Sequence, residues 1–236
     1  MIDQLKTKIF ADGADLEGIV KLSKDPMIKG FTTNPTLMRK AGLTDYAKFA
    51  QELLEEIPEM PVSFEVFADD EEGMREQATK IAAWGSNVYV KIPVTTTRGE
   101  LMAPLVRDLS EAGVQLNVTA LFTTAQVEVM AQALKDGAPS YVSVFAGRIA
   151  DAGIDPMPIM QSSVEILAEA PRSELIWASP REVLNLVQAD KVGCHIITMT
   201  HDLLAKTGGL GKGLEQFSLE TVHMFHRDAV AAAFSI

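Results

Sequence analysis

Short apolar segments alternate with longer amphipathic segments along the whole chain. The short segments are rich in β-branched and aromatic residues, which predicts strands at 8–11, 28–31, 62–67, 88–92, 114–120, 141–145, 175–178 and 194–199. The longer segments have one polar and one aliphatic face, which predicts helices at 46–55, 73–84, 101–112, 125–134, 157–169 and 180–189. Eight strands that are each followed by a helix predict a single-domain α/β protein, a closed (β/α)8 TIM barrel.

An open, doubly wound sheet is the alternative architecture. It would be favoured by a Gly-x-Gly-x-x-Gly turn after the first strand, but Asp12-Gly13-Ala14-Asp15 stands there instead. No low-complexity linker divides the chain, so we expect one barrel over residues 1–236. The glycine-rich segment 208–213 predicts a flexible joint that leads to an extra helix over 214–234. We expect residues 208–236 to pack on the barrel or on a neighbouring subunit.

Composition narrows the class of protein and the kind of partner. The 236 residues include 32 acidic and 21 basic side chains and a single cysteine, Cys194. One cysteine allows no internal disulfide, which fits a reducing cytoplasm. A net charge of −11 without a basic cluster argues against a nucleic-acid partner, and we expect neither a signal peptide at residues 1–6 nor a membrane span. Small anionic substrates remain possible, because one or two arginines can form a local binding pocket.

Polar side chains gather where the predicted strands end. In a (β/α)8 barrel the carboxyl ends of the strands surround one mouth, where the chemistry of such proteins is found. A structural strand end would more often be apolar, a glycine or a helix cap. The residues at these ends are Asp12, Thr33, Asn34, Glu65, Lys91, Asn117, Thr119, Phe145, Arg148, Ser179 and Arg181.

Lys91 is the most informative of these residues. It interrupts an otherwise apolar strand, and a buried ammonium is costly unless it is paired or the pKa of the lysine falls. A lysine with a lowered pKa can attack a ketone to form a Schiff base. Asp12 and Glu65, at the ends of the first and third strands, could move protons beside it. The competing interpretation is a structural ion-pair network in which the two carboxylates hold the lysine.

Two other kinds of protein compete with a Schiff-base enzyme. Glu220, His223 and His226 are three residues apart on the last predicted helix and could hold a divalent ion, although a solvated or subunit-facing stripe is the simpler interpretation. A non-catalytic phosphate-binding barrel would keep Arg148 but would have no use for a buried lysine. The glycines at 208–213 do not form a phosphate loop, because Lys212 is followed by glycine rather than by serine or threonine.

Four segments resemble the transaldolase family, and in particular its short branch, which includes the fructose-6-phosphate aldolases. They are GFTTNPT at 30–36, VKIPVT at 90–95, LNVTALF at 116–122 and YVSVFAGRI at 141–149. The similarity runs in the same order from about residue 8 to residue 200. It implies an α/β barrel that needs no cofactor or metal and that transfers a three-carbon ketol unit between sugar phosphates.

The resemblance also implies a role for each residue at the mouth. Lys91 would form the Schiff base, Asp12 would be the general base, and Glu65 with Thr119 would hold a catalytic water. Arg148 would bind the substrate phosphate, and Arg181 is a weaker candidate for the same role. The remaining candidates for substrate binding are Thr33, Asn34, Asn117, Phe145 and Ser179.

The chain departs from the family pattern in several places. Gly13 stands where the family has threonine, and the loop after Ser179 is compact, which leaves the identity of the sugar open. Phe145 and Glu65 replace the tyrosine and glutamine of the aldolase branch, and they favour transfer over cleavage. We therefore expect a cytoplasmic transaldolase of the pentose phosphate pathway, which moves a dihydroxyacetone unit from fructose 6-phosphate or sedoheptulose 7-phosphate to an aldose phosphate. The alternatives are aldolase-type cleavage and a related enzyme that acts on a modified sugar.

The resemblance to the short branch also bears on assembly. Together with a terminal helix that has no evident place on its own barrel, it predicts a homo-oligomer, either a pentamer or a decamer.

Overall fold

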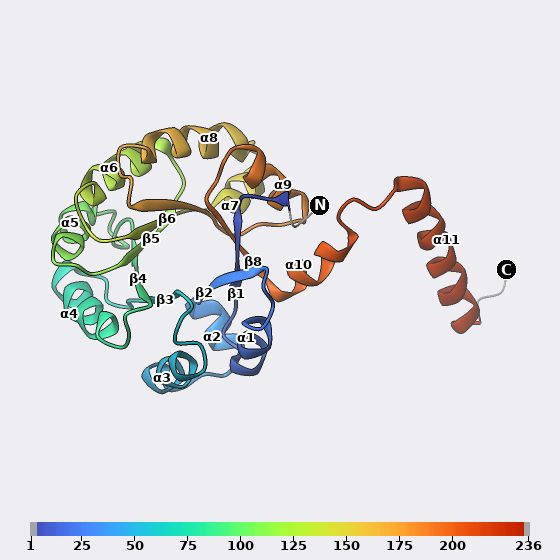
Figure 1. Cartoon of the computed structure of the whole chain (residues 1–236), viewed down its shortest axis with the longest axis horizontal. Helices are drawn as coiled ribbons and strands as arrows, with labels where there is room; N and C mark the ends of the chain where they lie inside the picture. Colours follow the sequence, from blue (N-terminus) through green and yellow to red (C-terminus); the bar gives the residue numbers. More distant parts are fainter. Residues whose placement is uncertain (1–3, 234–236) are drawn as a thin grey trace.

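A computed structural model describes residues 4–233 and confirms the predicted barrel (Figure 1). Eight parallel strands close on one another in chain order, with β1 paired to both β2 and β8. Each strand overlaps one of the predicted segments. The strands are β1 (Lys8–Asp12), β2 (Ile28–Thr32), β3 (Val62–Glu65), β4 (Val88–Pro93), β5 (Leu116–Leu121), β6 (Ser140–Val144), β7 (Ser173–Trp177) and β8 (Ile196–Thr200).

The helices surround the barrel, and six of them match predicted helices to within a few residues. These six are α3 (Tyr46–Glu56), α4 (Glu71–Ala82), α5 (Ala103–Glu111), α6 (Thr124–Leu134), α8 (Pro156–Leu167) and α9 (Leu184–Lys191). Helix α9 begins four residues later than the predicted start at 180, and in the preceding segment the N–H groups of Arg181 and Glu182 donate to Oδ1 of Asn185. Four short helices lie outside the predicted helical ranges: α1 (Leu16–Leu22), α2 (Pro35–Lys40), α7 (Ala146–Asp151) and α10 (His201–Lys206).

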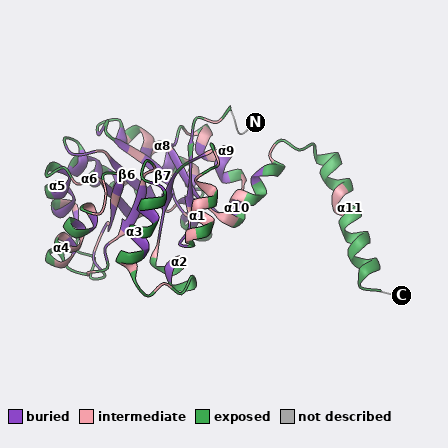
Figure 2. Ribbon diagram, turned by 60° about the horizontal axis from the view of Figure 1, so that its bottom comes forward, coloured by how far each residue is buried: buried purple, intermediate pink, exposed green. Residues whose placement is uncertain are grey.

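The strands separate two packing environments. Side chains that alternate outward, such as Val62, Phe64 and Val90, pack against the helices in the main hydrophobic core. Inside the barrel, a small aromatic and aliphatic cluster is built around Phe10 and Tyr141, which precede Asp12 and Ser143 by two residues on their strands. Figure 2 shows the strands as a continuous buried core beneath half-exposed helices. Because apolar side chains fill one end of the barrel, the polar residues share the other end.

Helix α11 (Leu214–Ala231) stands apart from this core (Figures 1 and 2). It follows a short 3-10 turn, η2 (Thr207–Gly209), and none of its residues is buried. Helix α11 therefore does not pack on its own barrel, which was one of the two predicted locations. Packing on a neighbouring subunit remains a prediction. Phe234, the predicted last residue of the helix, lies outside the described residues.

Within residues 4–233, no helix combines the length and the apolar character that a membrane span requires.

Candidate active site

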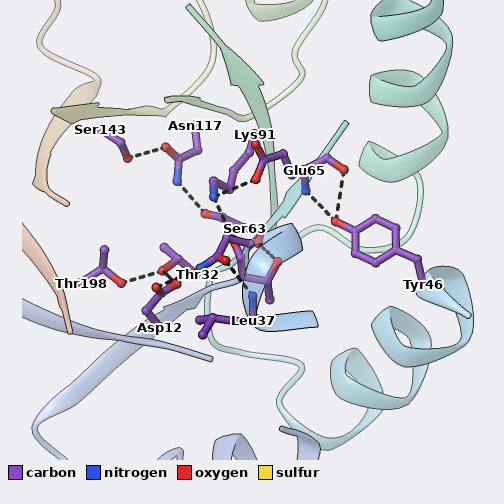
Figure 3. A network of polar contacts seen from close by, with 12 residues as sticks. Asp12, Thr32, Leu37, Tyr46, Ser63, Glu65, Lys91, Asn117, Ser143 and Thr198 are labelled. Carbon is purple, nitrogen blue, oxygen red and sulfur yellow. Dashed lines mark hydrogen bonds and ion pairs between the residues drawn. The ribbon is translucent and has the colours of Figure 1, made fainter. Parts of the chain in front are cut away.

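Lys91 lies inside the barrel on β4, and only 7% of its surface is exposed. Its Nζ donates one hydrogen bond to the main-chain carbonyl of Thr33 at 2.7 Å. It also contacts Oε2 of Glu65 at 3.2 Å, which forms an ion pair (Figure 3). A buried ammonium needs such partners, because losing its water shell without replacement costs several kcal/mol. The structure thus supplies the partners that the sequence analysis requires for a buried ammonium at position 91.

The register of the strands brings the partners of Lys91 to one level of the barrel. Glu65 on β3 pairs with Lys91, and Lys91 pairs with Asn117 on β5. Because side chains alternate along a strand, residues in register on neighbouring strands point to the same side. The three side chains therefore face the barrel interior together, and Thr119 lies two residues closer to the mouth.

Asp12, at the end of β1, has its own set of hydrogen bonds. Thr32 Oγ1 donates to Asp12 Oδ1 at 2.8 Å, and Asn34 Nδ2 donates to Asp12 Oδ2 at 3.1 Å. The Thr32 hydroxyl in turn lies 2.6 Å from that of Thr198 on β8. Burial raises the pKa of the Asp12 carboxyl above its ordinary value, while the nearby charge of Lys91 and the two hydrogen bonds act in the opposite direction. A carboxyl with a raised pKa is suited to exchanging protons.

Asn34 and Thr33 connect β2 to the site in different ways. Asn34 caps helix α2, because its Oδ1 accepts the N–H of Leu37 at 2.9 Å, and this bond leaves Nδ2 free to reach Asp12. The side-chain hydroxyl of Thr33 donates to the carbonyl of Ser63 at 2.9 Å. The group that Thr33 offers to Lys91 is therefore its main-chain carbonyl rather than its side chain.

A chain of polar groups crosses the interior beside Lys91. Ser143 Oγ donates to Asn117 Oδ1 at 2.7 Å, and Asn117 Nδ2 donates to Ser63 Oγ at 2.9 Å. Sequence reasoning missed both serines. Their signal was the two-residue alternation, because Ser63 lies two residues before Glu65 and Ser143 two residues before Phe145. These bonds hold the Asn117 amide in one orientation.

The two candidate phosphate ligands have different surroundings. Cζ of Arg148, on α7, lies 5.0 Å from the centre of the Phe145 ring, a cation–π contact. Among the described residues, no carboxylate forms an ion pair with Arg148. Arg181, in contrast, pairs with Asp151 through Nε at 3.1 Å and Nη2 at 2.5 Å. The charge of Arg181 is therefore already matched by a neighbour, whereas the charge of Arg148 is available.

A close backbone approach brings the Arg148 helix to Ser179. A Cβ added at Gly147 would lie 1.6 Å from the main-chain oxygen of Ser179, so only glycine fits there. Ser179 itself has φ 56°, a left-handed conformation that is unfavourable for a residue with a Cβ. The strand-end segments of β6 and β7 are therefore held together at the mouth.

The metal hypothesis for the last helix gains no support. Among residues 4–233, no group of three or more His, Cys, Asp or Glu side chains is arranged to hold an ion. Glu220 instead pairs with Lys212, two residues before the first residue of α11.

Residues 9–236 match the family described as Transaldolase/Fructose-6-phosphate aldolase. The chain belongs to this family. A "Probable transaldolase" of Dehalococcoides mccartyi is 39% identical over 198 residues, which span 84% of this chain and 88% of that protein. A "Probable transaldolase" of Nitrosopumilus maritimus is 35% identical over 201 residues, which span 84% and 86% of the two chains.

Solved structures share the barrel with much lower sequence identity. KGPDC from Streptococcus mutans aligns with a TM-score of 0.56 and 12% identity over 84% of this chain and 89% of that one. A 2,3-dimethylmalate lyase aligns with a TM-score of 0.55 and 16% identity over 97% and 86%. At this level of identity the likeness concerns the fold alone.

The raised pKa of Asp12 has a consequence for stability. Between pH 3.8, the ordinary pKa, and the raised pKa of the folded state, the folded chain holds a proton that the unfolded chain has released. Asp12 therefore lowers the free energy of unfolding progressively as the pH rises through this window. We expect Asp12→Asn to unfold at a higher urea concentration than the unchanged chain at pH 7, and the gain to shrink as the pH is lowered toward 3.8.

The matched control is Asp136→Asn, since Asp136 is an exposed carboxylate far from the barrel interior. It should change the urea midpoint at pH 7 very little, because substitutions of exposed side chains usually alter the free energy of unfolding by less than about 0.5 kcal/mol. If Asp12→Asn is less stable than the unchanged chain at pH 7, and if the difference increases as the pH is raised, the raised pKa of Asp12 in the folded chain is contradicted.

Proposed function

We propose that this protein is a transaldolase that moves a dihydroxyacetone unit from a ketose phosphate to an aldose phosphate through a Schiff base on Lys91. The observation that carries the proposal is a lysine amine buried at the carboxyl end of the barrel, with the Glu65 carboxylate 3.2 Å away and Asp12 close enough for the charge of Lys91 to affect its pKa. In the competing structural network both carboxylates would hold the lysine. Among the described residues only Glu65 forms an ion pair with Lys91, whereas Asp12 accepts hydrogen bonds from Thr32 and Asn34, which leaves Asp12 suited to a second proton transfer along the carbon chain.

Formation of the Schiff base is the first step. Glu65 takes a proton from the Lys91 ammonium, and the amine that results attacks the C2 carbonyl of fructose 6-phosphate or sedoheptulose 7-phosphate. The carbinolamine that forms loses water to give an iminium. Glu65, in contact with Nζ, receives and returns the protons that move in this step. Thr119, on the next strand and closer to the mouth, is suited to holding the water that leaves.

Cleavage of the carbon–carbon bond follows. Asp12 takes the proton of the C4 hydroxyl, the C3–C4 electron pair moves toward the iminium, and an aldose phosphate departs. The three carbons left on Lys91 form an enamine, which attacks the aldehyde of the second sugar while Asp12 returns its proton to the new hydroxyl. Water then adds to the iminium, which releases the product ketose and the Lys91 amine. Asn34, Asn117 and Ser179 bind the hydroxyls of the three-carbon unit, and the Thr33 backbone holds the lysine nitrogen.

The substrate phosphate binds Arg148 in this proposal. The Arg148 guanidinium stacks on Phe145 and has no ion-pair partner among the described residues, so it can form two parallel hydrogen bonds with a phosphate. Arg181 is a weaker candidate, because binding a phosphate would require it to leave or share Asp151.

Product analysis tests the reaction itself. With fructose 6-phosphate and erythrose 4-phosphate together, we expect sedoheptulose 7-phosphate as the main product, and without the acceptor only slow release of dihydroxyacetone. Lys91→Met should form neither product, and Asp12→Asn should be slower by about 10²- to 10⁴-fold, as is usual for loss of a general base. Equal rates of cleavage with and without acceptor would favour the aldolase alternative, and no turnover of either sugar would point to a modified sugar or to a non-catalytic barrel.

Separate alanine substitutions distinguish the two arginines. Arg148→Ala should raise the KM for fructose 6-phosphate by about ten- to a hundredfold, the effect of losing hydrogen bonds to a charged group. Arg181→Ala serves as the matched control, and we expect a smaller change. The phosphate assignment is wrong if the larger effect falls on Arg181→Ala.

We also propose that the chain assembles into a pentamer or a decamer through α11. Leu214, Phe217, Val222 and Phe225 share one face of this helix and are 83%, 52%, 59% and 63% exposed. A contiguous apolar face of this kind is typical of an interface.

Light scattering tests the assembly. The unchanged chain should have five or ten times the mass of one chain, and the double variant Phe217→Ser/Phe225→Ser should shift toward smaller species. His223→Ser, on the opposite face of α11, is the control and should not change the mass. A monomer for the unchanged chain would refute the proposal.

A further inference from the structure

The pairing of β2 with β3 stops just below Lys91. Phe31 pairs with Val62 and Thr32 with Ser63, and the N–H of Thr33 still donates to the carbonyl of Ser63 at 3.2 Å. In a parallel ladder the next bond would run from the N–H of Glu65 to the carbonyl of Thr33. The described residues do not form that bond, although both groups are at the ends of their strands.

The sequence that follows β2 explains why the ladder cannot continue. The next hydrogen bond of the ladder would run from the N–H of residue 35 to the carbonyl of Glu65, but residue 35 is a proline and has no N–H. Helix α2 begins at this proline and turns the chain away from the sheet. Both main-chain groups of Glu65 therefore face a gap where β2 has left, and a buried backbone group without a partner is costly.

The hydroxyl of Tyr46 fills this gap. It accepts the N–H of Glu65 at 2.6 Å and donates to the carbonyl of Glu65 at 3.2 Å, so one phenol replaces two strand partners (Figure 3). The carbonyl of Thr33, which the ladder would have used, instead accepts Nζ of Lys91 at 2.7 Å.

The ring of Tyr46 is fixed by its neighbours. It lies against Trp84 with ring centres 5.6 Å apart, against Phe67 at 4.8 Å and against Phe64 at 6.0 Å. Burial raises the pKa of the Tyr46 hydroxyl above its ordinary value, so the phenol keeps the proton that it donates.

We propose that Tyr46 is a positioning residue, which takes the place of β2 at Glu65 and thereby frees the Thr33 carbonyl to hold the nitrogen of Lys91. The catalytic consequence rests on the Schiff base proposed above. An iminium on Lys91 retains one N–H, and a main-chain carbonyl accepts it at every stage because it does not change protonation. Glu65 is then free to exchange protons while the nitrogen stays aligned.

Tyr46→Phe tests this role, because it keeps the ring and its aromatic contacts and removes only the hydroxyl. We expect the rate of borohydride-trapped adduct formation at saturating fructose 6-phosphate to fall about tenfold or more, because Lys91 then loses its hydrogen bond to the Thr33 carbonyl, while KM changes less than about twofold. Tyr141→Phe is the matched control, since it removes a hydroxyl inside the same barrel, where Tyr141 packs on Phe10 and Tyr89, and no hydrogen bond joins Tyr141 to Lys91 among the described residues. It should leave the trapping rate unchanged.

A crystal structure of Tyr46→Phe gives a second readout that does not depend on turnover. We expect the N–H of Glu65 to bond to the Thr33 carbonyl and Nζ of Lys91 to leave it. An unchanged trapping rate, equal losses in both variants, or a Lys91 that stays on the Thr33 carbonyl would overturn the role of Tyr46. If the unchanged chain traps no adduct, the proposed function fails, and the crystal structure still decides whether Tyr46 controls the Lys91 contact.

Discussion

A buried ammonium in the middle of a barrel is the constraint on which the site depends. Lys91 has little access to water, so the protein must supply acceptors for its charge. One comes from the Glu65 carboxylate on the neighbouring strand, and the other is a main-chain carbonyl of β2. Glu65 is the last residue of β3 and pairs with Lys91, and Thr33 follows the last residue of β2, so both acceptors lie where their strands end. The lengths of these two strands therefore determine which groups bind the Lys91 amine.

The same region contains features that are unfavourable for stability. Asp12 is a carboxyl with a raised pKa, Ser179 has a left-handed backbone, and the β2–β3 ladder is cut short. Strain and desolvated charge of this kind collect at functional sites, where the rest of the fold must compensate for them. Here the compensation comes from the apolar cluster around Phe10 and from the outer core between strands and helices.

Much of the fold follows from the sequence, because periodicity and strand number leave few architectures open. Lys91 and Glu65 could be predicted as site residues, since each interrupts an apolar strand at a cost that needs an explanation. Tyr46 could not, because its position on an amphipathic helix is ordinary and its contact with Glu65 depends on where β2 ends. Short helices such as α2 were missed because six residues are too few to show a helical period.

The family places the chain among transaldolases and fructose-6-phosphate aldolases, and the proposed chemistry rests on a covalent bond at one nitrogen. The most direct test is to incubate the chain with fructose 6-phosphate, reduce with borohydride, digest and map the product by mass spectrometry. The account predicts a reduced three-carbon adduct on the peptide that contains Lys91. An adduct on another lysine, or none while the sugar is still consumed, would contradict it.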